Sequence, residues 1–104
     1  MSTECERGLA RLQEWQGSEV MAHSTFSELP GRGSFRAVVS DIDPHEKLVR
    51  LKRLGVPEDQ SYCVVFLGDC ECNIFTPTGA QPNLIIRFGR QSGEQITFTH
   101  QPDS

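Results

Sequence analysis

The sequence predicts a mainly β fold, a small antiparallel barrel or sandwich-like domain of six to seven strands with one N-terminal α-helix. Short segments rich in β-branched and aromatic residues recur at close spacing, and glycine, proline and aspartate separate them. Helical periodicity occurs in one segment alone, so the chain lacks the crossover helices that parallel strands require. The 104 residues are sufficient for a single domain, which we expect to span 1–104.

Residues 3–16 are predicted to form the helix, because apolar side chains recur there at spacings of four, three and three. This apolar stripe consists of Cys5, Leu9, Leu12 and Trp15. Thr3 and Glu6 fit a capping box at its start, and Gly17 suits the left-handed residue that ends many helices. The opposite face of the helix is polar and is expected to be solvated.

Seven strands are predicted where the apolar period changes to two. Their expected ranges are 19–26, 34–42, 47–54, 62–67, 70–75, 83–88 and 95–100, followed by a tail at 101–104. A turn at 43–46 should join the second and third strands as a hairpin. The last two strands should form another hairpin, in which Ile86 and Phe88 meet Ile96 and Phe98.

Gly68 and Asp69 lie between two apolar segments and suit a two-residue hairpin turn with glycine in the first position. This predicts that the strand at 62–67 pairs with the strand at 70–75. Because side chains alternate along a strand, one face of this pair is expected to be wholly apolar.

The four cysteines are Cys5, Cys63, Cys70 and Cys72. Structural zinc sites usually take ligand pairs separated by two to four residues, whereas Cys70 and Cys72 flank a single residue in a predicted strand. Strand geometry sets these two thiols roughly 7 Å apart, too far for an unstrained disulfide. We expect free, buried thiols that pack as small hydrophobic groups, and no cofactor. A metal or redox site and a disulfide are the alternatives.

Asp41, Asp43, His45 and Glu46 gather carboxylates and an imidazole within six positions. Such groups can ligate a divalent metal ion or act as a general acid–base pair. Aspartate before proline also opens turns, because its carboxylate accepts hydrogen bonds from nearby backbone N–H groups. Turn chemistry is the expected role, and a metal site is the alternative.

The composition disfavours nucleic acid and membranes as partners. The formal net charge of −4 opposes binding to polyanions. No apolar run approaches the roughly 20 residues that cross a bilayer, and no secretory signal is visible, so a cytoplasmic protein is expected. The sequence contains no nucleophile elbow, phosphate-binding loop or paired-histidine metalloprotease motif, which argues against an enzyme. Candidates for binding a small anion or nucleotide are Arg7, Arg11 and Arg36.

The predicted strands carry more apolar faces than one helix can cover. Uniform alternation from the turn at 43–46 puts Val38 on the inner face of its hairpin and Val39 on the outer face. The residues expected to be covered by a second copy of the chain are Phe35, Val39, Leu48, Leu54, Val64 and Phe66. A homodimer is therefore expected, with a different protein as the alternative partner.

These patterns favour a non-catalytic binding or assembly module that self-associates. The second hypothesis is a receptor for a small anion or nucleotide on a small β-barrel. The third is a metal-dependent enzyme that uses the acidic cluster at 41–46.

Overall fold

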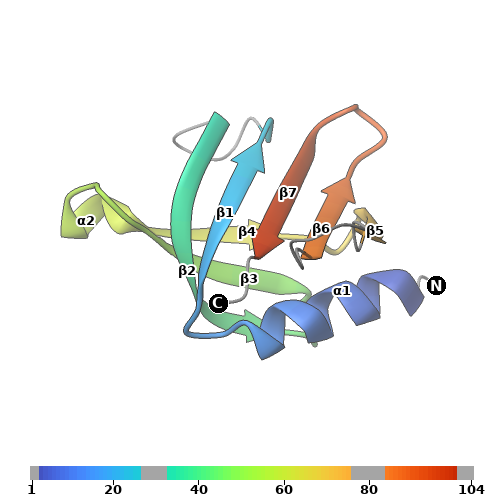
Figure 1. Cartoon of the computed structure of the whole chain (residues 1–104). Coiled ribbons are helices and arrows are strands. Elements are labelled where there is room, and N and C mark those ends of the chain that lie inside the picture. Colours follow the sequence, from blue (N-terminus) through green and yellow to red (C-terminus); the bar gives the residue numbers. More distant parts are fainter. Residues whose placement is uncertain (1–2, 27–32, 76–83, 101–104) are drawn as a thin grey trace, which may run out of the picture.

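The computed structural model describes residues 3–26, 33–75 and 84–100 and shows a mainly β protein with an N-terminal helix (Figure 1). In these ranges helix α1 (Thr3–Glu14) precedes seven antiparallel strands that form one sheet. The strands are β1 (Glu19–Ser24), β2 (Gly33–Asp43), β3 (Leu48–Arg53), β4 (Tyr62–Phe66), β5 (Glu71–Phe75), β6 (Leu84–Gly89) and β7 (Gln95–His100). The predicted fold class is confirmed, and the predicted tail at 101–104 lies outside the described residues.

A second helix, α2 (Glu58–Ser61), lies between β3 and β4 and was not predicted. It is a single turn that follows Pro57, in the segment between the strands predicted at 47–54 and 62–67. In the described part of the chain, neither helix is long and apolar enough to cross a lipid bilayer.

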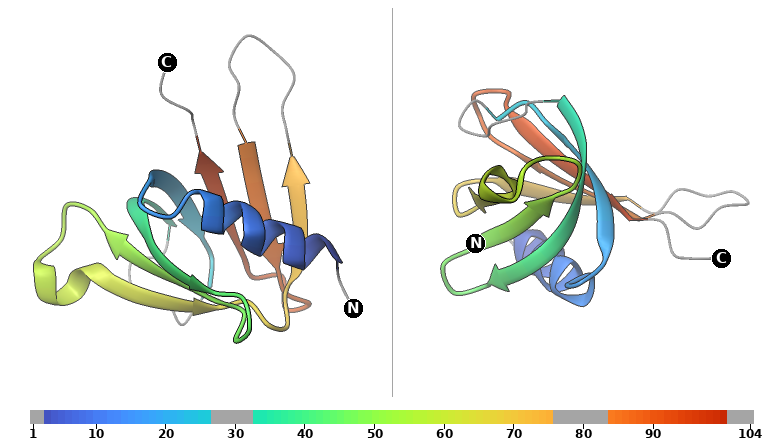
Figure 2. Two further views of the ribbon diagram at one scale, coloured as in Figure 1. Left: turned by 90° about the horizontal axis from the view of Figure 1, so that it is seen from below. Right: turned by 90° about the vertical axis from the view of Figure 1, so that its left-hand side faces the viewer.

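The sheet curves into an open, barrel-like shape (Figure 2). The strand order is β4-β3-β2-β1-β7-β6-β5, so β4 and β5 are its two edges. Helix α1 packs against β5 and β2, which lie in different halves of the sheet. The helix therefore covers the interior of the curved sheet and joins its two halves.

The apolar stripe of α1 is buried, as its spacing predicts. Its members Cys5, Leu9, Leu12 and Trp15 are at most 7% exposed. Gly8 marks the closest approach of the helix to the sheet, because a Cβ there would clash with the Cys72 sulfur and lie 3.1 Å from Phe88 Cζ. Gly17 follows the helix with a φ of +86°, and its N–H donates to the Val39 carbonyl at 2.7 Å. Close packing thus requires glycine at Gly8, and the left-handed backbone conformation favours glycine at Gly17.

Two predicted hairpins are confirmed. β2 pairs with β3 across a turn at 44–47, one residue later than the predicted 43–46, and β6 pairs with β7. In the second hairpin Ile86 lies opposite Phe98 and Phe88 lies opposite Ile96. All four side chains are fully buried, and the rings of Phe88 and Phe98 meet edge to face at 6.2 Å. This hairpin supplies the part of the core beneath α1.

The predicted pairing of 62–67 with 70–75 is wrong. β4 pairs with β3, and β5 pairs with β6 at the opposite edge of the sheet. Gly68 lacks the positive φ that type I′ and II′ turns require at their first central position, so the turn does not align the two strands. Each of the two segments nevertheless has the expected apolar face, because alternation sets the faces of a strand whatever its partner. The buried residues on these segments are Cys63, Val65, Leu67, Cys70 and Cys72.

A β-bulge in β2 reverses the predicted faces of Val38 and Val39. The register with β3 shifts between Val39 and Asp41, so that Ser40 is an extra residue without a partner. Ile42 faces the core on one side of the bulge and Val39 faces the core on the other side. Uniform alternation from Ile42 would instead have placed Ser40 and Val38 toward the core. Val39 is fully buried in the core, so its predicted place on an outer, dimer-forming face is wrong. Val38 is half-buried on the outer face.

Candidate functional site

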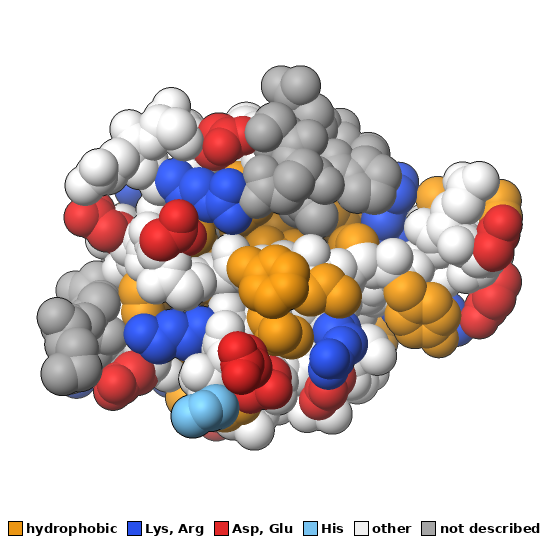
Figure 3. All heavy atoms as spheres, turned by 180° about the vertical axis from the view of Figure 1, so that it is seen from behind, with side chains coloured by type: hydrophobic (Ala, Val, Ile, Leu, Met, Phe, Trp, Pro, Cys, Tyr) orange, Lys and Arg blue, Asp and Glu red, His pale blue; other side chains and the backbone are white. Residues whose placement is uncertain are grey.

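Three apolar side chains are exposed in a row on the outer face of the edge strand β4. Tyr62, Val64 and Phe66 are 58%, 40% and 60% exposed, whereas Cys63 and Val65 between them are buried. Alternation produces this pattern, since the inward residues join the core and the others face solvent. Figure 3 views the molecule from the side on which β3 and β4 lie and shows hydrophobic side chains at the centre of that surface. We call Tyr62, Val64 and Phe66 the β4 row.

Cationic side chains of β3 border the β4 row. In the strand register Arg50 lies beside Val64, and Lys52 lies beside Tyr62. Arg50 Nη1 forms an ion pair with Asp41 Oδ2 at 2.7 Å, and Lys52 Nζ lies 5.7 Å from the centre of the Tyr62 ring. The row is therefore an apolar strip with charged groups on one side and the open edge of the sheet on the other.

The structure brings together only some of the residues predicted for an interface. Two of them lie in the β4 row, and Leu54 is 37% exposed just beyond β3. Leu48 lies opposite Phe66 but is buried, and Phe35 packs against the core. The prediction missed Tyr62, although its position two residues before another member of the row places it on the same face.

The acidic cluster has the turn chemistry that its sequence predicts. Asp43 Oδ1 accepts hydrogen bonds from the backbone N–H groups of His45 and Glu46, each at 3.0 Å. Asp41 is instead held in its ion pair with Arg50. Over residues 3–26, 33–75 and 84–100, no three His, Cys, Asp or Glu side chains are grouped as a metal site requires.

The three arginines predicted to bind a ligand lie on two different elements. Arg7 and Arg11 are exposed on α1, and Arg11 Nη1 lies 3.0 Å from a carboxylate oxygen of Glu14. Arg36 is exposed on β2, where its Nη2 lies 2.6 Å from Glu19 Oε2. An anionic ligand at Arg11 or Arg36 would therefore compete with a carboxylate that is already in place.

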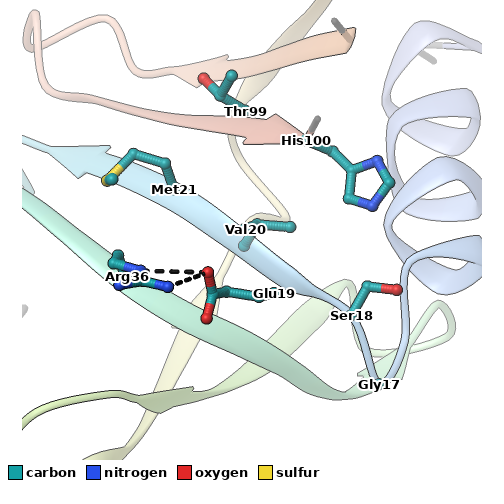
Figure 4. Close-up of a pocket in the computed structure, with 8 residues that line it drawn as sticks. All are labelled: Gly17, Ser18, Glu19, Val20, Met21, Arg36, Thr99 and His100. Atoms are coloured by element: carbon teal, nitrogen blue, oxygen red, sulfur yellow. Dashed lines mark hydrogen bonds and ion pairs between the residues drawn. The ribbon is translucent and has the colours of Figure 1, made fainter. Parts of the chain in front are cut away.

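Arg36 and Glu19 line an open groove of about 710 Å³ between the start of β1 and the end of β7 (Figure 4). The rest of its lining is Gly17, Ser18, Val20, Met21, Thr99 and His100. The imidazole of His100 stacks on the buried indole of Trp15, with ring centres 4.7 Å apart. Figure 4 shows this imidazole beside α1 and the Arg36–Glu19 pair on the other side of the groove. The imidazole and the ion pair thus lie apart and do not converge on one point of the groove.

All four cysteines are buried, as predicted, and none of them forms a disulfide. Cys5 Sγ donates a hydrogen bond to the Cys70 carbonyl at 2.9 Å, which ties α1 to the start of β5. Burial raises the pKa of the Cys63 thiol, and the nearby Arg53 partly opposes this effect. Burial likewise raises the pKa of the Cys70 thiol, against a hydrogen bond from Arg90. The fold therefore favours the neutral thiol at both positions.

The free energy of unfolding should fall as the pH rises above about 9, the ordinary thiol pKa. In the unfolded chain Cys63 and Cys70 ionise at that pKa, whereas the folded protein holds their protons to higher pH. Raising the pH therefore favours the unfolded state, which has lost more protons. Urea unfolding under reducing conditions at several pH values measures this fall. The double variant Cys63→Ala, Cys70→Ala should show a shallower fall, and an unchanged slope would contradict the assignment.

Comparison of this chain with models of protein families, with curated proteins and with solved structures found no match. Within the described residues, the β4 row is the largest gathering of exposed apolar side chains on any one element.

Proposed function

We propose that this protein is a non-catalytic binding or assembly module that self-associates, and that the β4 row forms the contact between copies. The supporting observation is the exposure of Tyr62, Val64 and Phe66 side by side on one short strand. Burial of apolar surface is favourable by about 25 cal/mol per Å², and tyrosine and phenylalanine are enriched at protein interfaces. Twofold dimers are the commonest closed assemblies of identical chains, so a homodimer is the expected state.

Sedimentation velocity across the micromolar concentration range tests this proposal. The wild-type protein should sediment as a dimer that dissociates on dilution. A monomer at every concentration, without binding of a dye that reports exposed apolar surface, would refute self-association.

Phe66→Glu should shift the protein from dimer to monomer. The substitution places an unpaired carboxylate in the proposed interface, and leaving such a charge buried costs several kcal/mol. Because Phe66 is 60% exposed in the single chain, the variant should fold normally, which circular dichroism can verify. Met21→Glu is the matched control, since Met21 is an exposed apolar residue on β1, outside the β4 row. A dimer that Met21→Glu abolishes and Phe66→Glu spares would place the contact elsewhere.

A further inference from the structure

The backbone groups on the open edge of β4 belong to the residues of the β4 row. The N–H of Leu67 donates to the Lys47 carbonyl at 2.7 Å, and Leu67 continues the register of β4 with β3. In an antiparallel pair the residues that bond to the neighbouring strand alternate, so the odd-numbered residues of β4 bond to β3. The N–H and C=O groups of the β4 row consequently point away from β3. Among them, the Phe66 carbonyl accepts a hydrogen bond from Arg90 Nη2 at 3.3 Å.

The sequence of β4 lacks the devices that keep edge strands from pairing with other chains. Protected edges carry charged residues, proline or a bulge. β4 reads Tyr-Cys-Val-Val-Phe and contains neither a charge nor a proline, and its register with β3 runs without a shift. Its outward side chains are apolar, and its outward backbone groups are those that a further strand would use.

We propose that two copies of this chain join by antiparallel pairing of their β4 strands about a twofold axis at Val64; this inference rests on the self-association proposed above. The β4 row reads aromatic, valine, aromatic, so the pairing sets Tyr62 of each copy opposite Phe66 of the other. The Val64 N–H of each copy donates to the Val64 carbonyl of the other. The Phe66 N–H donates to the Tyr62 carbonyl in the same way. Directly opposed aromatic side chains stabilise such cross-strand pairs.

The charges at the two ends of β4 favour an antiparallel over a parallel arrangement of two copies. Glu58 and Asp59 on α2 form an acidic end just before β4, where Lys52 Nζ lies 3.8 Å from Glu58 Oε1. At the other end lies Lys47, while Arg90 there is close to Asp69, at 4.0 Å. Antiparallel pairing places the acidic end of one copy near this mixed end of the other, whereas parallel pairing would bring the two acidic ends together. The charges therefore favour the antiparallel arrangement, in which the order aromatic, valine, aromatic matches a second copy of itself.

Val64→Pro tests the pairing without touching the hydrogen bonds between β3 and β4. Proline removes the Val64 N–H, which points to the open edge, and proline is tolerated on edge strands. Val64→Ala keeps the N–H although it removes two methyl groups, so it is the control for loss of the valine side chain at this position. The dimer of Val64→Pro should be weaker than that of Val64→Ala by at least about tenfold in dissociation constant. Circular dichroism checks that both variants fold.

Val64→Cys provides a measurement that does not depend on how proline is accommodated. Residues paired across a twofold axis in this way have Cα atoms about 5.5 Å apart, within the range that a disulfide spans. Oxidation with diamide, which accepts the two thiol hydrogens, should link Val64→Cys into a covalent dimer. Leu54→Cys, exposed but outside β4, should stay unlinked.

The outcomes separate this inference from the proposed function. Loss of the dimer in Val64→Pro and cross-linking of Val64→Cys would support edge pairing. A wild-type dimer that persists in Val64→Pro, together with no cross-link in Val64→Cys, would overturn edge pairing and leave self-association standing. A wild-type monomer would overturn both.

Discussion

Val39→Glu should lower the free energy of unfolding by about 3 to 5 kcal/mol at neutral pH. Val39 is fully buried in the core, between the sheet and the end of α1, where its carbonyl accepts the Gly17 N–H. A carboxylate at this position would lie among the apolar side chains of the core, and an unpaired buried charge costs about 3 to 5 kcal/mol. Small domains are stable by only about 5 to 15 kcal/mol, so much of the folding free energy would be lost. Urea unfolding followed by circular dichroism measures the loss.

Val38→Glu is the matched control for this prediction. Val38 is the preceding residue, but it lies on the outer face with Glu19 and Lys52 as its cross-strand neighbours. The new carboxylate would remain hydrated beside a lysine, and the free energy of unfolding should change by less than about 1 kcal/mol. The opposite result, a stable Val39→Glu and an unfolded Val38→Glu, would mean that β2 has no bulge at Ser40.

Gly8→Val should lower the free energy of unfolding by about 3 kcal/mol or more. The Cβ alone would clash with the Cys72 sulfur and approach Phe88 Cζ to 3.1 Å and Ile86 Cγ2 to 3.4 Å. Valine adds two methyl groups to that contact, so α1 must move off the sheet, and overpacking of this kind typically costs about 1 to 3 kcal/mol or more. Chemical or thermal unfolding of the two proteins measures the difference.

Two controls distinguish the packing of Gly8 from its helix propensity. Ala10→Val lies two residues further along α1 on an exposed position and should cost only about 0.5 kcal/mol. Gly8→Ala would stabilise a solvent-exposed helix by about 1 kcal/mol, but here it should destabilise the protein. Adding Cys72→Ala removes the sulfur and should recover part of that loss. A Gly8→Ala protein that is more stable than the wild type would show that α1 does not pack closely there.

Local periodicity accounts for the features that the sequence predicts correctly. The stripe from Cys5 to Trp15 needs only the pitch of a helix, and the burial of Ile86 and Phe88 needs only alternation along a strand. Gly17 was identified because a helix end needs a residue that tolerates positive φ. Each of these properties is set within a few residues of the chain.

Strand partners depend on contacts far apart in sequence, which local patterns do not contain. Gly68 and Asp69 form a turn, yet β4 pairs with β3 and β5 pairs with β6, because the turn lacks the twist that holds two strands together. The bulge at Ser40 is a second example. An extra residue in one strand is apparent only in the register with its partner, and it exchanged the faces of Val38 and Val39.

The candidate site combines both kinds of information. The sequence by itself determined that Val64 and Phe66 face away from the apolar side of their strand, since alternation is a property of the strand alone. Only the tertiary structure decided that this strand is an edge of the sheet, so that its outward side chains are exposed and its outward backbone groups have no strand beside them within the described residues. The physical reason is that a strand becomes an edge through the pairing of every other strand, which is settled by packing of the whole chain rather than by any segment of it.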